Sequence, residues 1–125
     1  MQRKFRLTRS EDFKRVRRSG KSYAHPLVVL IVQGHDLRGR PEDKGTLRLK
    51  VGVAAGRTVG PAVYRNRAKR LLREAIRPLL PDITPGLDLL LIARPGLTSA
   101  TLEEARQALL NLLQRARILI PLNES

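Results

Sequence analysis

The sequence predicts one α+β domain, an α/β sandwich in which helices cover a small central sheet. Helical and strand patterns alternate along the chain in the order α-β-β(-β)-α-β-α, which is typical of a sheet with helices packed on it. The chain has 125 residues, close to the common size of a single domain. Aliphatic side chains have to fill the core, because the chain has only two Phe, two Tyr and no Trp. We therefore expect residues 1–125 to form a single domain.

The first third of the chain predicts a helix followed by a buried strand. Thr8 and Glu11 have the spacing of a capping box, in which two side chains bond the first backbone amides of a helix. Gly20 suits the end of that helix, so we expect it to span residues 10–19. Residues 27–33 are mainly β-branched residues and leucine, and this run predicts a buried strand.

A second strand is predicted at residues 46–54, where side chains alternate between an apolar and a small or cationic face. Residues 34–45 are polar and rich in turn residues, so we expect them to connect the two strands as a hairpin. An extra strand in this first hairpin remains an alternative. The apolar face consists of Leu47, Leu49, Val51 and Val53, and the other face of Arg48, Lys50, Gly52 and Ala54.

The following helix is predicted to have a buried stripe and a cationic stripe. It begins near Pro61, which the first turn of a helix tolerates, and ends about Arg77, because Pro78 disfavours helix at the residue before it. At 100° per residue the apolar residues gather on one face and most of the cations on the other. We expect the buried stripe to consist of Tyr64, Ala68, Leu71, Leu72, Ala75 and Ile76.

The last third predicts a linker, a buried strand and an amphipathic helix. Residues 81–86 form the linker and residues 87–94 the strand. A second capping box at Thr101 and Glu104 starts the final helix. The segment from the strand at 46–54 to the strand at 87–94 is a β-α-β unit, which favours parallel pairing of the two strands.

The positive charge of the chain is concentrated in two segments. The chain has 25 Lys and Arg against 11 Asp and Glu, a formal net charge of +14. Residues 1–21 hold nine cations and two anions, and residues 65–77 hold six cations and one anion. Basic stripes of this kind attract a polyanion. Nucleic acid fits better than a membrane, because the longest apolar runs are too short to span a bilayer.

Several kinds of site are missing from the sequence. The chain has no cysteine, which excludes a disulfide, a thiolate nucleophile and a cysteine-based zinc site. Neither His25 nor His35 has the spaced carboxylate and nucleophile of a catalytic triad. We expect no catalytic residue and no metal site on the protein. The basic N-terminus lacks the apolar stretch of a signal peptide, so we expect a cytoplasmic protein without a membrane partner.

One motif is more specific than the charge. It is Gly60-Pro61-Ala62-Val63-Tyr64-Arg65-Asn66-Arg67-Ala68-Lys69-Arg70-Leu71-Leu72-Arg73-Glu74. This array resembles the signature of the protein subunit of bacterial ribonuclease P. The resemblance continues in the same order and spacing through three further segments: Glu11-Asp12-Phe13-Lys14-Arg15-Val16, Lys50-Val51-Gly52-Val53 and Ile92-Ala93-Arg94-Pro95-Gly96.

The resemblance implies a ribonucleoprotein endoribonuclease that removes the 5′ leader from precursor tRNA. In that family the RNA subunit is catalytic, and Mg²⁺ is bound mainly by the RNA subunit and the substrate. The protein binds the RNA subunit and the leader, and we expect one protein per RNA subunit. The family fold also implies a left-handed β-α-β crossover, against the general right-handed preference.

The basic helix is the predicted binding site for the RNA subunit. Guanidinium groups bind phosphate oxygens in pairs, a lysine acts as a point charge, and an amide fits a 2′-hydroxyl or a base edge. The alternative is that these cations only solubilise a packed helix, and that the amide is an ordinary surface group. The predicted residues are Arg65, Asn66, Arg67, Lys69, Arg70 and Arg73.

The resemblance also implies a cleft for the single-stranded leader, where bases stack on aromatic rings in a basic groove. Arg17 stands where the family often has a second aromatic residue, and Val53 where it often has phenylalanine, so this cleft should be less aromatic. Core packing remains an equal alternative for Phe13. The predicted leader-binding residues are Phe13, Arg17, Lys50, Arg57 and Tyr23.

Two other function classes remain open at this point. A structural RNA-binding protein, such as a small ribosomal protein, has the same composition but would not need the extended array on the basic helix. A protein ribonuclease acting alone would need an acid–base pair that the sequence does not offer.

Overall fold

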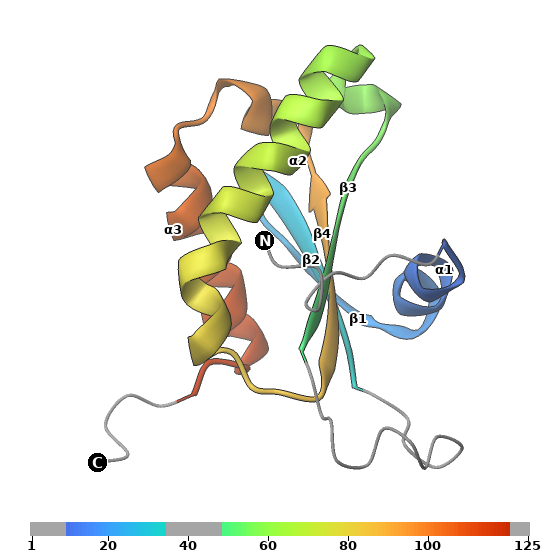
Figure 1. Cartoon of the computed structure of the whole chain (residues 1–125), viewed down its shortest axis with the longest axis vertical. Coiled ribbons are helices and arrows are strands. Elements are labelled where there is room, and N and C mark those ends of the chain that lie inside the picture. Colours follow the sequence, from blue (N-terminus) through green and yellow to red (C-terminus); the bar gives the residue numbers. More distant parts are fainter. Residues whose placement is uncertain (1–9, 35–48, 121–125) are drawn as a thin grey trace.

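The computed structural model in Figure 1 describes residues 10–34 and 49–120, with side chains from Phe13 onward. It confirms the α+β class: a four-stranded sheet lies between helices, in the strand order β1-β2-β4-β3. The helices are α1 (Ser10–Ser19), α2 (Ala62–Ile76) and α3 (Leu102–Ala116), and the strands are β1 (Lys21–Ala24), β2 (Val28–Gly34), β3 (Lys50–Ala55) and β4 (Leu87–Ala93). Short 3-10 turns are η3 (Arg57–Val59), η4 (Arg77–Asp82) and η5 (Pro95–Ser99).

The sheet confirms one predicted pairing and overturns another. β3 pairs with β4 in parallel, as the β-α-β unit predicts. The hairpin expected between the strands at 27–33 and 46–54 is wrong, because β4 lies between β2 and β3 and pairs with both. β4 is buried on both faces, and such a strand takes the centre of a sheet. The hairpin that does form joins β1, the extra strand, to β2.

The sheet has helices on both faces (Figure 1). α2 and α3 cover one face, where they bury the main core around Leu30, Leu89 and Leu91. α1 packs on the opposite face, against β2 and β4, through a smaller cluster of Val16, Ile31 and Leu90. Leu49, Val51 and Val53 belong to the main core, as the alternation in this strand predicts; Leu47 and Arg48 lie outside the described residues. The handedness implied for the β-α-β crossover stays a prediction.

The helix boundaries follow from local signals. α1 has the predicted bounds, although Thr8 of its capping box lies outside the described residues. The capping box of α3 is present: the Thr101 hydroxyl accepts from the Glu104 amide at 3.1 Å, and the Glu104 carboxylate accepts from the Thr101 amide at 2.8 Å. The predicted linker at residues 81–86 begins inside the 3-10 turn η4, which buries Leu79 and Leu80.

Tyr64 differs from its predicted place in the core. The other predicted residues of the stripe are buried or half-buried, whereas Tyr64 is 45% exposed and its neighbour Val63 is 70% exposed. Both lie in the first turn of α2, and the buried stripe begins one turn later, at Ala68. The ring of Tyr64 lies instead beside Gly60, where a Cβ atom would be 3.4 Å from the Tyr64 Cδ2.

The turn between α1 and β1 depends on close packing at Gly20. The Gly20 amide donates to the Val16 carbonyl at 2.8 Å. A Cβ atom at this position would lie 2.5 Å from the Ile31 Cγ2 and 2.5 Å from the Val16 oxygen, closer than real contacts allow. Gly20 therefore lets the end of α1 approach β2 directly.

Replacement of Gly20 by alanine should destabilise the fold. We expect Gly20→Ala to lower the free energy of unfolding by about 1–3 kcal/mol, because backbone and core must shift to admit the methyl group. The measurement is urea denaturation followed by circular dichroism. Gly56→Ala is the matched control, because a Cβ atom there meets nothing within 4 Å and the backbone has φ −86°. Equal stability losses in the two variants would contradict this account.

Candidate nucleic-acid interface

The outward face of α2 carries the predicted RNA-binding residues in one continuous strip. Ala68, Leu72, Ala75 and Ile76 are buried against the core, which fixes the rotation of the helix. Because neighbours on a helix surface are three and four residues apart, the cations on the outer side lie close to one another. Asn66, Arg67 and Arg70 are exposed, and Arg65, Lys69 and Arg73 are half-buried at the edges of the strip. The structure therefore places all six predicted residues on one surface.

The cations at the start of this strip have no carboxylate to neutralise them. Among the described residues, no salt bridge involves Arg65, Arg67, Lys69 or Arg70. The carboxylate of Glu74, the only acidic residue of α2, binds Arg77 at 2.8 Å, beyond the C-terminal end of the helix. The Nε of Arg65 is buried and has no hydrogen-bond partner. Like charges at this spacing repel each other, so an anion along the strip would be stabilising.

The opposite face of the sheet carries three of the five predicted leader-binding residues, Phe13, Arg17 and Lys50, and Arg57 follows the end of β3 in η3. Lys50 and Ala54 of β3 are aligned with Asp88 and Ile92 of β4, so they lie on the face of the sheet that α1 packs on. α1 contacts mainly β2 and β4, and β3 is the edge strand beside it.

Phe13 and Arg17 lie one helical turn apart on α1, so they share one side of the helix. Phe13 is half-buried and packs against the cluster of Val16, Ile31 and Leu90, and Arg17 is exposed. Arg57 is exposed in η3, directly after β3. Phe13 is thus neither fully buried in the core nor fully exposed.

Tyr23 does not belong to this surface. It is paired with Leu30, whose side chain lies in the main core, and it packs against that core from the edge strand β1. Phe13 lies on the other face of the sheet, in the cluster under α1. The prediction that Tyr23 adds a ring to the same cleft is wrong, because side chains of a strand alternate between the two faces of the sheet. Lys21 lies over the Tyr23 ring, with its Nζ 5.9 Å from the centroid.

One polar contact that holds α1 on the sheet was not predicted from the sequence. The Arg15 guanidinium donates to the Asp88 carboxylate and to the Gln33 side-chain oxygen, which lie side by side on β4 and β2. Asp88 is only 2% exposed, the one buried charged residue in the described part of the chain. A carboxylate inside a strand of leucines is itself a signal, because a buried charge requires a partner. The sequence does not say which cation supplies it.

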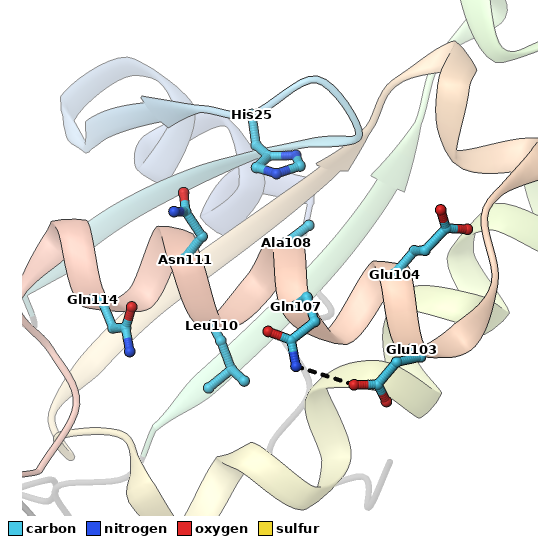
Figure 2. Close-up of a pocket in the computed structure, with 8 residues that line it drawn as sticks. All are labelled: His25, Glu103, Glu104, Gln107, Ala108, Leu110, Asn111 and Gln114. Atoms are coloured by element: carbon cyan, nitrogen blue, oxygen red, sulfur yellow. Dashed lines mark hydrogen bonds between the residues drawn. The ribbon is translucent and has the colours of Figure 1, made fainter.

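The outer face of α3 differs from that of α2 in charge. It borders a hollow of about 490 Å³ in which the ring of His25 faces the helix (Figure 2). The wall from α3 has two carboxylates, Glu103 and Glu104, together with the amides of Gln107 and Asn111. Glu103 also accepts a hydrogen bond from Gln107 at 3.0 Å. Carboxylates repel phosphate, so α2 rather than α3 is the side of the helical layer suited to nucleic acid.

The described residues do not provide a metal-binding group of their own. No three His, Asp or Glu side chains come close enough to hold an ion in residues 10–34 and 49–120. In the same ranges, no helix combines the length and apolar character needed to cross a bilayer.

Comparison with known proteins gives the same family throughout. The sequence model of the family Ribonuclease P matches residues 1–117. The ribonuclease P protein component of Brevibacillus brevis is 38% identical over 119 residues, which cover 95% of this chain and 88% of that protein. The component from Herpetosiphon aurantiacus is 39% identical over 118 residues, 94% of this chain and 89% of that protein.

Solved structures show the same architecture. The RNase P protein from Thermotoga maritima has a TM-score of 0.71 and 29% identity, covering 88% of this chain and 96% of that one. The RNase P protein of Staphylococcus aureus, at 24% identity, supports the fold alone, with a TM-score of 0.75 over 92% of this chain and 97% of that chain. The matching family model and these relatives, which are alike over nearly the whole length, show that the chain belongs to the ribonuclease P protein family.

Proposed function

We propose that α2 anchors the RNA subunit of ribonuclease P, and that the surface between α1 and β3 holds the leader of precursor tRNA. The chain is a protein component of ribonuclease P, an accessory subunit of the ribonucleoprotein endonuclease that processes the 5′ leader of tRNA. Family membership decides against the structural RNA-binding protein and the protein-only ribonuclease that the sequence also left open.

The observation that carries this proposal is the row of cations on α2 without carboxylate partners. Arg65, Arg67 and Arg70 present planar forks that match two phosphate oxygens each, and Lys69 adds a point charge. Asn66 is exposed among them and can both donate and accept, which suits a 2′-hydroxyl. Binding of a phosphate backbone would remove the repulsion between these cations and release counterions. A structured RNA fits this strip better than a small anion does, because the strip extends over more than two turns of helix.

The leader is assigned to the other side because the surface there suits a single strand. Phe13 offers part of an aromatic ring, Arg17 of the same helix and Lys50 of β3 supply cations on that face of the sheet, and Arg57 is exposed just beyond the end of β3. A single-stranded nucleic acid binds by base stacking on rings and by phosphate contacts in a basic groove. With Tyr23 on the other face of the sheet, stacking rests on Phe13 alone, and phosphate contacts carry more of the affinity.

The chemistry itself is assigned to the RNA. The described residues do not fit a resident metal ion, so no reaction step is assigned to a metal on the protein. We place Mg²⁺ in the RNA subunit and the substrate, with one protein per RNA subunit in the cytoplasm. What this chain contributes is positive charge on two opposite sides, which lowers the repulsion between two polyanions brought together for cleavage.

The proposal is tested by reconstitution with the cognate RNA subunit at low Mg²⁺ concentration. Under that condition few metal ions screen the phosphates, so the protein should increase the rate of leader removal from precursor tRNA. The chain without RNA should have no activity. Unchanged cleavage by the RNA in the presence of the chain would contradict the proposal.

Loss of one cation from α2 should weaken binding of the RNA subunit. We expect Arg65→Ala or Arg67→Ala to cost on the order of 1–3 kcal/mol of binding free energy, because each removes charge-assisted hydrogen bonds to phosphate. The slope of log affinity against log salt should fall by about one for each variant. Filter binding over a salt series measures both quantities. Arg106→Ala, which removes one cation from α3, is the control and should change affinity little; an equal effect there would argue against α2 as the anchor.

Loss of Arg57 should discriminate between the two forms of tRNA. Arg57→Ala should weaken holoenzyme binding to precursor tRNA more than to mature tRNA, because only the precursor has a leader. Equilibrium binding to both RNAs gives the ratio of affinities. Arg70→Ala on α2 is the matched cation loss, and it should leave that ratio unchanged in fully assembled holoenzyme. If Arg57→Ala weakens both RNAs equally, Arg57 does not contact the leader.

A further inference from the structure

The start of α2 carries an apolar patch inside the most basic region of the described surface. The patch consists of Val63, 70% exposed, and Tyr64, 45% exposed. The other large exposed apolar side chains among the described residues, Leu102 and Ile120, lie at the start of α3 and beyond its C-terminal end. The Tyr64 ring lies outside the core, so its exposed part is available to a binding partner.

The ring of Tyr64 is held in a defined place. Gly60 has a φ of +131°, a conformation that favours glycine, and the Tyr64 ring and Cβ lie against it. The Tyr64 amide donates to the Pro61 carbonyl at 2.9 Å, which ties the residue to the first turn of the helix. One part of the ring is thus supported by backbone and the rest is accessible, as in a platform on which a flat group can lie.

The charges around the ring select the partner. Arg67 is three residues further on α2, so its side chain is a neighbour of Tyr64, and Val63 and Arg67 are neighbours at i,i+4. A phosphate gains little from a neutral ring, whereas a nucleobase stacks on it while the adjacent phosphates bind the arginines of α2.

We propose that Tyr64 stacks on an unpaired base of the RNA subunit, at the end of the phosphate-binding strip of α2. This inference rests on the proposed function. It gives α2 a contact with an exposed base, in addition to the contacts of this helix with the RNA backbone. Sequence-specific recognition of RNA favours bases outside helices, because only these expose a face for stacking. The basic strip then fixes the position along the backbone, and Tyr64 fixes the register at an unpaired nucleotide.

Affinity measurements separate stacking from simple apolar contact. Tyr64→Leu should weaken binding of the RNA subunit about tenfold, within the range for one stacked base. Tyr64→Phe should stay within about twofold of the original affinity. The salt dependence should be unchanged in both, because no phosphate contact is lost. Leu102→Ala, an exposed apolar truncation on α3, is the control and should bind normally.

Fluorescence gives a direct readout of the same contact. The chain has two tyrosines and no tryptophan, so a Tyr23→Phe protein reports on Tyr64 alone. Addition of the RNA subunit should quench the Tyr64 emission, and the quenching should stop increasing when the protein is saturated with RNA. Full affinity of Tyr64→Leu, or emission unaffected by RNA, would overturn the proposal.

The outcome is distinguishable from failure of the proposed function. Weak binding by Arg67→Ala with normal binding by Tyr64→Leu rejects only the stacking contact, and normal binding by both rejects α2 as the anchor. A Tyr64→Leu protein that alters self-association in sedimentation, with unchanged RNA affinity, would assign the patch to a second copy of the chain and also overturn the proposal. Thermal unfolding of Tyr64→Leu should match that of the original protein, because the ring lies outside the core.

Discussion

The central strand β4 is the constraint on which the other layers depend. Its side chains alternate between the core under α2 and α3 and the smaller cluster under α1, and it pairs with neighbours on both edges. A strand buried on both faces cannot tolerate a loss of cover from either side, so the helices on the two faces stabilise one another through it. The same strand separates the two proposed RNA surfaces. α2 lies on one face of the sheet and α1 on the other, so the two proposed surfaces point to opposite sides of one domain (Figure 1).

The position of α1 depends on a second, polar interaction. The apolar cluster beneath it is small, and a cluster of this size alone does not determine how a short helix lies across a sheet. The contact of Arg15 with Asp88 and Gln33 supplies that direction, because it joins the helix to two neighbouring strands at one level of the sheet. A buried carboxylate is costly unless it is paired, so the arrangement penalises any other placement of α1. It also withdraws one arginine of a basic helix from the surface offered to RNA.

Much of this structure could be predicted from local sequence, and the errors share a cause. Helix bounds, the capping box at Thr101 and the alternation of residues 49–54 depend on neighbours within one or two turns of chain. The place of β4 between β2 and β3 depends on contacts distant in sequence, which periodicity cannot reveal. Tyr64 fits the apolar stripe by angle, but the angle does not say where along its axis a helix leaves the core. The face of the sheet on which Tyr23 lies follows from its pairing with Leu30. The strand β1 is too short for its sequence to predict that register.

The contrast between α2 and α3 has a consequence for how the complex forms. One side of the helical layer carries uncompensated positive charge, and the other has the carboxylates of Glu103 and Glu104 around a polar hollow. The domain therefore has a charge dipole across this layer, and the field of a nearby polyanion exerts a torque on it. Encounters that begin with α3 forward gain less attraction, because the two carboxylates and two arginines of this helix cancel, than encounters that begin with α2 forward. The domain is oriented during diffusion, before any hydrogen bond forms, so a larger share of encounters begins with α2 facing the RNA.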